Sequence, residues 1–189
     1  MGRVSQAQAQ ENRKRIIDTA SRLFREQGTH VSVADVMKAA GLTHGGFYKQ
    51  FASKEALVDE ATAHAFAEVS GRRAAADQGR RELIDAYLAA DHRDNAAAGC
   101  PVAGLAADIA RGAGDAEARR TYAEGVTAFA DLLAGADGGE GGGEGDGRAD
   151  GLAQLSTLVG ALVLARATKG SPVSEEILAA ANKALTAGS

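Results

Sequence analysis

Several residue types are scarce in this chain of 189 residues, which has no tryptophan, two prolines, one cysteine and 4% aromatic residues. A single cysteine excludes an internal disulfide and favours a reducing compartment. No window alternates β-branched and aromatic residues between turn signals, so no sheet is expected. The scarcity of proline, together with recurring alanine and leucine, predicts an all-α fold.

Long apolar runs and catalytic patterns are missing as well. No apolar run is long enough to span a bilayer and the N-terminus lacks the apolar core of a signal peptide, so we expect a soluble, cytoplasmic protein that uses no membrane. His44, His64 and His92 are scattered and lack supporting cysteines or acids, which predicts no metal and no cofactor. No nucleophile–base pair or nucleotide loop stands out, so we do not expect an enzyme.

Acidic charge dominates the chain, but unevenly. The net charge is −4, made up of +2 over residues 1–60 and −6 over residues 61–189. A weakly basic N-terminal module on an acidic body fits a DNA reader whose other domain has a different task. The alternative is ordinary variation of surface charge, and charge alone does not decide between the two.

Residues 10–27 carry the pattern of an amphipathic helix that Gly28 ends. Ser32 is placed to cap the next helix, residues 33–40, with Asp35 in capping-box position. The inward residues of the two helices are expected to be Ile16, Ile17, Ala20, Leu23, Phe24, Val36, Met37 and Ala40.

The stretch of residues 40–57, AGLTHGGFYKQFASKEAL, carries the strongest functional signal. Gly41 suits the left-handed position that ends a helix, and Thr43 is expected to cap a short helix that runs through Phe51. Ser53 is expected to cap the helix that follows. Two helices joined by a tight glycine-containing turn place the second one in the DNA major groove. The sequence therefore predicts a helix-turn-helix.

Two domains follow from this pattern. Residues 1–53 are predicted to be a DNA-binding domain of three helices with one small core, into which Phe47 and Phe51 point because they lie four residues apart. Residues 54–73 are predicted to be a long connecting helix. The side of that helix predicted to be buried carries Leu57, Val58, Ala61, Ala65 and Val69.

Residues 54–189 are predicted to form a helical domain for effector binding and dimerisation. Its expected helical segments lie near residues 54–73, 80–92, 101–112, 115–135, 149–169 and 173–186. Residues 135–147 contain eight glycines and four acids. Such a composition buries little apolar surface, so residues 135–150 are predicted to be a flexible loop.

The pieces RKRIIDTASRLFREQG, VSVADVMKAAGLTHGGFYKQF and SKEALV follow one another between residues 12 and 61. In their order and spacing the chain resembles the N-terminal domain of the TetR family of bacterial transcriptional regulators. The rest of the chain is similar to that family only in length and helical content. The resemblance implies a homodimeric repressor that leaves its double-stranded DNA operator when a small-molecule effector binds the C-terminal domain. The competing interpretation is a helical adaptor without specific DNA binding.

The resemblance implies DNA contacts from the short helix and the start of the next one, at Thr43, His44, Gly45, Tyr48, Lys49 and Lys54. Gly45 and Gly46 are poor helix formers, by about 1 kcal/mol each relative to alanine, and their pairing indicates a close backbone approach to DNA. The alternative for them is an irregular turn without a partner.

Phosphate contacts are expected from Thr43, Tyr48, Lys54 and Ser32, together with the first amides of the helix after Ser53. Base-edge contacts are expected from His44 and from Lys49, the latter to guanine O6 or N7, although His44 is equally suited to a phosphate. Basic residues near the N-terminus either reach the DNA backbone or minor groove or form a solvated basic start, namely Arg3, Arg13 and Lys14.

A dimer is expected because one module makes too few contacts for specific binding, and its half-sites would lie about 34–36 Å apart in a pseudo-palindromic operator. The segment ADGLAQLSTLVGALVLARA is apolar nearly all round, which indicates burial on more than one side. The predicted interface residues are Leu155, Leu158, Val159, Leu162, Ile177, Leu178, Ala181 and Leu185. The alternative for this helix pair is a purely intramolecular core.

The sequence of the predicted effector-binding domain contains no motif as specific as the helix-turn-helix. The candidate pocket residues are Phe66, Tyr87, Cys100, Tyr122 and Phe129, and they suit a hydrophobic or aromatic effector, although each aromatic residue is also suited to plain core. Cys100 precedes Pro101 at a helix start, where a thiolate is favoured, and His92 and Arg93 are close in sequence. A thiol-based repressor that responds to oxidants or electrophiles through Cys100 is therefore an alternative, as is a buried, inert cysteine.

Overall fold

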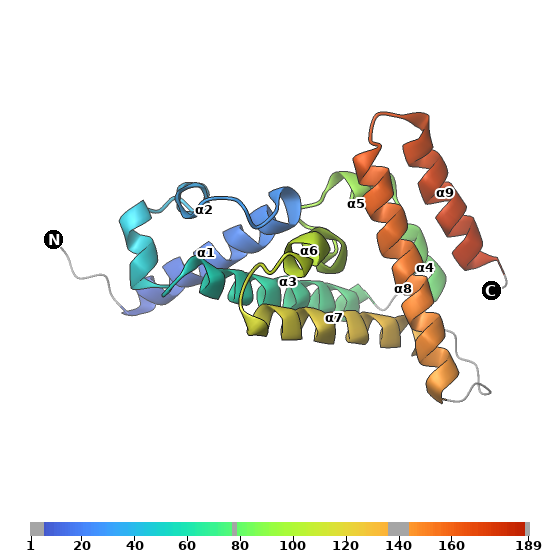
Figure 1. Cartoon of the computed structure of the whole chain (residues 1–189), viewed down its shortest axis with the longest axis horizontal. Helices are drawn as coiled ribbons and strands as arrows, with labels where there is room; N and C mark the ends of the chain where they lie inside the picture. Colours follow the sequence, from blue (N-terminus) through green and yellow to red (C-terminus); the bar gives the residue numbers. More distant parts are fainter. Residues whose placement is uncertain (1–5, 77–78, 136–143, 188–189) are drawn as a thin grey trace.

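The computed structural model describes residues 6–76, 79–135 and 144–187, and these ranges consist of helices and short connections without a strand (Figure 1). The all-α prediction is confirmed. Within the described ranges no helix is both long and apolar enough to cross a bilayer.

The N-terminal end of the molecule is built from α1 (Gln6–Gln27), α2 (Val33–Ala39) and the 3₁₀ helix η1 (His44–Lys49). Helix α1 begins four residues before its predicted start and ends at Gly28, whose positive φ of 89° is the left-handed stop that the sequence predicts. The Ser32 hydroxyl accepts the Asp35 amide at 3.1 Å, which confirms the cap of α2.

The short helix predicted through Phe51 is present, but it ends two residues earlier than predicted and the predicted Thr43 cap is wrong. The segment is a 3₁₀ helix that ends at Lys49, and the Thr43 side chain makes no capping hydrogen bond. Gly45 and Gly46 have low α-helix propensity, so they do not favour a longer α-helix here. A 3₁₀ helix closes its hydrogen bonds over three residues and is common in short segments of this kind. Phe51 lies just after this helix and is still hydrogen-bonded to it, because its amide donates to the Phe47 carbonyl at 3.0 Å.

The core beneath η1 is larger than the small three-helix core that the sequence predicts. Phe47 and Phe51 are buried and stacked, with ring centroids 5.4 Å apart. The same cluster includes side chains from three later helices, α3 (Lys54–Ala76), α6 (Pro101–Ala110) and α7 (Ala116–Gly135). These side chains are Leu57, Val58, Ala61, Leu105, Ile109 and Ala118. The N-terminal helices are therefore packed directly against the rest of the chain.

Two predictions about the later helices need correction. The single segment expected over residues 80–92 is divided into α4 (Arg80–Tyr87) and α5 (Ala90–Asp94). Helix α8 (Glu144–Ala167) begins inside the predicted loop 135–150, so residues 144–150 are helical, while residues 136–143 lie outside the described ranges. Tertiary packing explains the longer helix, because Gly151 lies directly against the backbone of α7.

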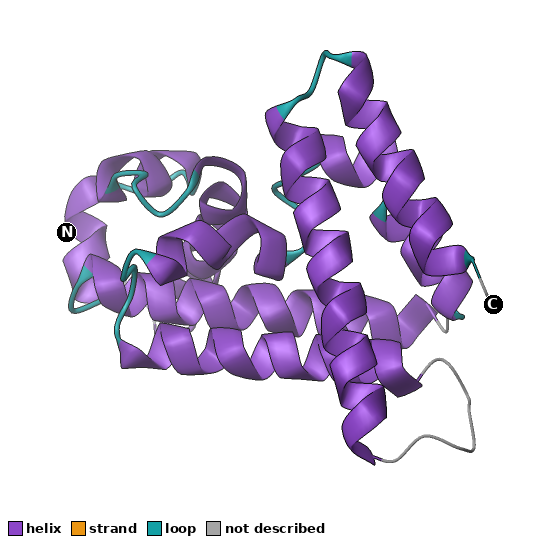
Figure 2. Cartoon of the chain, turned by 45° about the vertical axis from the view of Figure 1, so that its right-hand side comes forward, coloured by secondary structure: helices purple, strands orange, loops and turns teal. Residues whose placement is uncertain are grey.

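The elements form an elongated body in which α1, α3 and α7 run side by side and α6 lies across them (Figure 1). Helix α8 crosses the end of α7 and packs along α9 (Pro172–Thr186) at the other end of the molecule (Figure 2). Helix α3 therefore spans the distance from η1 to the C-terminal helices.

Candidate DNA-binding surface and effector cavity

The surface formed by η1 and the start of α3, which we call the head surface, presents polar and small residues to solvent. Phe47 is fully buried, while its neighbour Tyr48 is 67% exposed. The predicted DNA-contact residues on this surface are Thr43, His44, Gly45, Tyr48 and Lys49, all exposed, with Gly46 and Lys54 half-buried. The structure thus brings seven of the eight predicted DNA-contact residues together.

The cationic side chains at and near the head surface differ in whether they form ion pairs within the chain. In the described part of the chain, Lys49 and Lys54 take part in no ion pair, so their ammonium groups face solvent uncommitted. Arg13 is instead held within the protein, where Glu60 accepts from its Nη2 at 2.6 Å and its guanidinium lies 4.6 Å from the Phe51 ring centroid. The guanidinium of Arg13 is therefore already engaged by contacts within the chain. Arg3 lies outside the described ranges.

Ser32, the eighth predicted contact, is exposed on α2 but its hydroxyl is engaged locally. It accepts the Asp35 amide and lies 2.6 Å from the Asp35 carboxylate. A hydroxyl that donates to a neighbouring carboxylate offers no free proton to a phosphate. The N-terminus of α3 is capped as predicted, with the Ser53 hydroxyl accepting the Ala56 amide at 3.1 Å.

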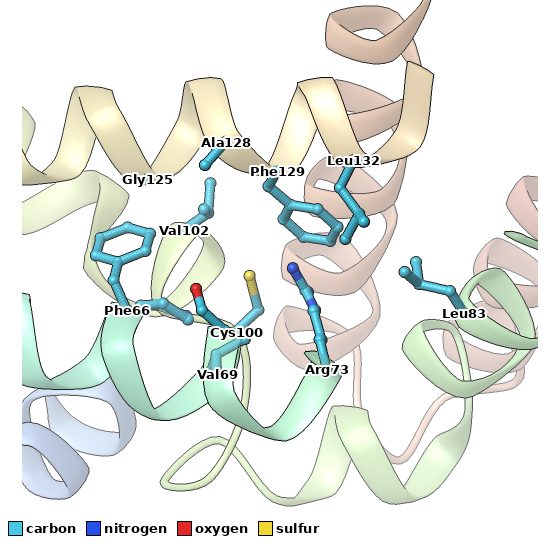
Figure 3. A pocket seen from close by; sticks show the side chains of 12 residues that line it. Phe66, Val69, Arg73, Leu83, Cys100, Val102, Gly125, Ala128, Phe129 and Leu132 are labelled. Carbon is cyan, nitrogen blue, oxygen red and sulfur yellow. The ribbon is translucent and has the colours of Figure 1, made fainter. Parts of the chain in front are cut away.

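A cavity of about 330 Å³ lies between α3, α6 and α7 (Figure 3). Apolar side chains make most of its wall, and one cation, Arg73, reaches into it from α3. The residues that line it are Phe66, Val69, Ser70, Arg73, Leu83, Cys100, Pro101, Val102, Gly125, Ala128, Phe129 and Leu132. Its size falls at the lower end of pockets that bind small organic molecules.

Three of the five predicted pocket residues line this cavity, namely Phe66, Cys100 and Phe129. Tyr87 lines a second, adjoining cavity of about 280 Å³. Tyr122 lines neither: it packs edge-on against Phe66, its hydroxyl donates to the Val102 carbonyl at 2.7 Å, and burial raises its pKa to about 12. Tyr122 therefore supports the wall from behind.

Cys100 stands at the N-cap of α6 with Pro101 in the first turn, as the sequence predicts, and its side chain is 3% exposed. The Cys100 amide donates to His92 Nε2 at 3.1 Å, and His92 Nδ1 lies 2.6 Å from the Tyr87 carbonyl. This pair of bonds requires the neutral imidazole, and burial lowers the pKa of His92, with the nearby arginines adding to the effect.

Arg93, although close to Cys100 in sequence, directs its guanidinium to other partners. Arg93 is turned toward α9, where it donates to the Ser174 hydroxyl at 3.0 Å and pairs with Glu175 and Asp94. The cations near Cys100 come from elsewhere in the chain and are Arg73 and Arg166.

Both the sequence and the fold of this chain are similar to those of known proteins. The model of the bacterial regulatory proteins of the tetR family matches residues 16–61, which span α1 through the first turns of α3. The HTH-type transcriptional regulator AcrR of Shigella flexneri is 43% identical over 61 residues, which are 32% of this chain and 28% of AcrR. The aligned part is thus little more than a quarter of that curated relative.

Solved structures extend the likeness to the whole fold. Reduced NemR from E. coli superposes with a TM-score of 0.74 at 19% identity, covering 94% of this chain and 96% of NemR. A TetR-family regulator from Cytophaga hutchinsonii gives 0.74 at 20% identity and 98% coverage of both chains. A TetR regulator from Chloroflexus aurantiacus gives 0.71 at 25% identity, covering 95% and 94%.

Residues 16–61 therefore form a DNA-binding domain of the TetR family, and the whole chain shares the fold of TetR-family regulators. Its family-specific residues are those of the head surface and the core behind it, whereas the helices around the cavity share the family's fold at low identity.

The predicted dimer residues of the C-terminal helices are divided between core and surface. Leu155, Leu158, Leu162, Leu178 and Ala181 are buried within one chain, and Val159, Ile177 and Leu185 are half-buried against the same core. The intramolecular alternative therefore accounts for most of the predicted set. The large apolar side chains that α8 and α9 leave exposed are Leu152, Val163, Leu164 and Val173.

Arg73 is the main cavity residue that the sequence analysis does not predict. The sequence analysis has it only as the last residue of the predicted connecting helix, residues 54–73. Val69 lies four residues before it on the apolar side of that helix, so the spacing already put Arg73 on the inward face. The signal that could have identified Arg73 is therefore a cationic side chain that continues the apolar side of the predicted helix.

Proposed function

We propose that the protein is a homodimeric repressor that binds a pseudo-palindromic operator through the head surface and leaves it when a small apolar effector occupies the cavity. The observation that supports this most is the continuity of α3. Its first turn carries Lys54 at the head surface, and its last turns carry Phe66 and Arg73 at the cavity. One helix of 23 residues therefore connects the two sites.

The head surface is suited to the major groove. Buried Phe47 fixes the backbone of η1, while exposed Tyr48 and Lys49 extend from its outer side. We assign Lys49 to a base edge, and Thr43, Tyr48 and Lys54 to phosphates. His44 lies 6.2 Å from the Tyr48 ring, edge to face, so the two side chains act as one contact unit.

A dimer would place two head surfaces about 34–36 Å apart, in successive major grooves. We propose that it forms through the outer faces of α8 and α9, where Leu152, Val163, Leu164 and Val173 are exposed. Large apolar side chains grouped on one helix pair are typical of a surface that a partner covers.

The cavity wall is tied directly to the DNA-binding helices. Arg25 of α1 is buried, and it donates to the Gly99 carbonyl at 3.0 Å and to Glu68 of α3 at 2.8 Å. Gly99 precedes Cys100 and Pro101, which line the cavity. A ligand that displaces this segment would therefore also shift α1 relative to α3 and change the spacing of the two head surfaces.

Release requires that the effector bind the non-DNA state more tightly, by about 1.4 kcal/mol for each tenfold loss of DNA affinity. Because the two head surfaces must engage both half-sites at once, a small change in their spacing is enough to break simultaneous contact.

A binding-site selection with the full chain, followed by salt titrations on the selected operator, tests the proposal. Lys54→Ala should weaken binding to all sequences and reduce the salt slope by about one unit, because one phosphate contact is lost. Lys49→Ala in the same selection should relax base preference at one position per half-site. Lys183→Ala, an exposed lysine of α9, is the matched control and should change neither. No sequence enriched by the wild-type chain would favour the adaptor interpretation.

A thiol-responsive repressor is a second candidate, favoured by the cavity wall that Cys100 forms beside Arg73 (Figure 3). Because the side chain is otherwise buried, a reagent would reach the thiol through the cavity. N-ethylmaleimide should then release the wild-type chain from its operator and leave Cys100→Ser bound. Release that persists in Cys100→Ser would rule this candidate out.

A further inference from the structure

Arg73 is placed as a ligand-binding cation. It rises from the last turns of α3 into the cavity, and its guanidinium carbon lies 3.5 Å from the centroid of the Phe129 ring (Figure 3). A guanidinium that stacks on an aromatic face keeps its N–H donors at the edge of the plane. The donors of Arg73 are therefore available to a molecule that lies beside Phe129.

Neighbouring arginines have acceptors, whereas Arg73 lacks a carboxylate partner. Arg25 and Arg72 both pair with Glu68, and Arg166 donates to two backbone carbonyls. Among the described residues, Arg73 forms no ion pair, and its one side-chain acceptor is the thiol of Cys100, a weak acceptor, while Tyr87 and Arg72 interact with it electrostatically. Burial lowers the pKa of Arg73, which reflects the cost of holding this cation away from water.

A second unused donor borders the same space. Tyr87 is 5% exposed, and its buried hydroxyl makes no hydrogen bond of acceptable geometry in the described chain, the thiol of Cys100, a weak acceptor, being the side chain it interacts with. Tyr87 interacts electrostatically with Arg73, and it lines the adjoining cavity, whose wall also includes Val69, Leu83, Arg73 and Cys100. Buried donors without acceptors are uncommon in folded proteins and call for a partner.

The walls of the two adjoining cavities contain no carboxylate in the described part of the chain, while they contain two arginines, Arg73 and Arg72, of which Arg72 pairs with Glu68 outside the wall. His92 also lines the second cavity, but as the neutral imidazole. A recess with cationic side chains and no acid has a positive potential, which favours anions and disfavours cations. The larger cavity is otherwise mainly apolar, with Phe66, Val102 and Leu132 among its walls.

We propose that the effector is an apolar carboxylic acid, bound as its carboxylate, with its aromatic or aliphatic body in the larger cavity and its two oxygens at Arg73 and Tyr87. This rests on the proposed function only in taking the cavity as the effector site. A carboxylate supplies acceptors for both donors, and charge-assisted bonds of this kind are about twice as strong as neutral ones. A neutral isostere fills the same apolar space and leaves the cation unpaired.

Matched acid and amide pairs test the proposal on the full-length chain. The probes are octanoate with octanamide, 4-phenylbutyrate with 4-phenylbutyramide, and 1-naphthylacetate with 1-naphthylacetamide, followed by calorimetry and thermal shift. At least one acid should bind ten or more times tighter than its amide. Arg73→Met should abolish that preference, Arg73→Lys should retain part of it, and Arg81→Met, a mostly exposed arginine of α4, should retain all of it.

Tyr87→Phe separates binding from folding. Removing a buried hydroxyl without a partner should leave the thermal midpoint of the free chain unchanged or higher, while acid affinity falls severalfold and amide affinity does not. The proposal is overturned if no acid of the panel binds at millimolar concentration, if each acid and its amide bind equally, or if Arg73→Met keeps the preference. Acids that bind through Arg73 but leave the selected operator complex intact would uphold this site and refute the proposed function.

Discussion

The head surface and the cavity differ in how the chain satisfies its polar groups. In the head, Ser32 and Ser53 each accept an amide three residues ahead. Around the cavity, Arg25 reaches a carbonyl 74 residues away and Arg93 reaches a hydroxyl 81 residues away. Local caps therefore set where the helices of the head begin, although later helices complete its core, whereas the polar contacts around the cavity join residues that only folding brings together.

The two regions also differ in how completely they are filled. Phe47 is stacked, fully buried and surrounded, whereas the space beside Phe129 stays open and is bordered by a cation. A filled core holds a fixed shape for DNA, and an open one leaves room for a ligand. Substitutions in the head core, at the crossing of α7 and α8 and at His92 test this difference.

The largest effect is expected in the head core. Phe47→Ala should lower the free energy of unfolding by about 3–5 kcal/mol, because it removes a fully buried aromatic ring. Urea denaturation at fixed protein concentration measures this. Tyr48→Ala is the matched neighbour, and as an exposed residue it should change stability by less than about 0.5 kcal/mol while DNA binding is lost. Equal losses in the two variants would show that η1 is not packed as described.

A smaller effect is expected where α7 and α8 cross. A Cβ at Gly151 would meet the carbonyl group of Ala130, with the carbonyl carbon 3.0 Å away. Gly151→Ala should therefore destabilise the chain by about 1–3 kcal/mol, because backbone must move. Gly71→Ala in α3, where no atom lies within 4 Å, should instead gain up to about 1 kcal/mol of helix propensity. A stabilising Gly151→Ala would contradict the close crossing.

The smallest effect concerns acid at the wall of the second cavity, which His92 lines. His92 is held neutral by Cys100 and Tyr87, and burial lowers its pKa in the folded state. The unfolded chain therefore binds the extra proton first, so His92 contributes stability above pH about 6.5 that is lost as the pH falls toward its folded pKa. Urea titrations at pH 7.5 and pH 5.5 should show this loss. In His92→Gln the difference between the two pH values should shrink, and an unchanged difference would mean that other groups carry it.

The sequence predicts the head well because its signals act within a few residues. The positive φ of Gly28 and Gly41, the two serine caps and the inward pair Phe47 and Phe51 are all confirmed. The errors there are the Thr43 cap and the end of the short helix, which is a 3₁₀ helix that ends at Lys49 instead of Phe51. They arose where two adjacent glycines allow more than one local conformation.

The body was predicted less well because its contacts are long-range. Three predicted pocket residues line the cavity, but Arg73 was overlooked, because an arginine at a helix end is usually solvated and only α6 and α7 enclose this one. Five predicted dimer residues proved to be core of a single chain, since an apolar segment does not say which neighbour covers it.

The helical fold class, the family resemblance and the residues of the head surface can be read from the amino-acid sequence, because helix periodicity, caps and glycine stops are local properties of the chain. The place of the cavity, the burial of Arg73 and Tyr87 beside it without a carboxylate, and the link from its wall to α1 through Arg25 emerge only from the folded chain. Those properties depend on which residues distant in sequence become neighbours, and hence on which charges lose water without gaining a partner.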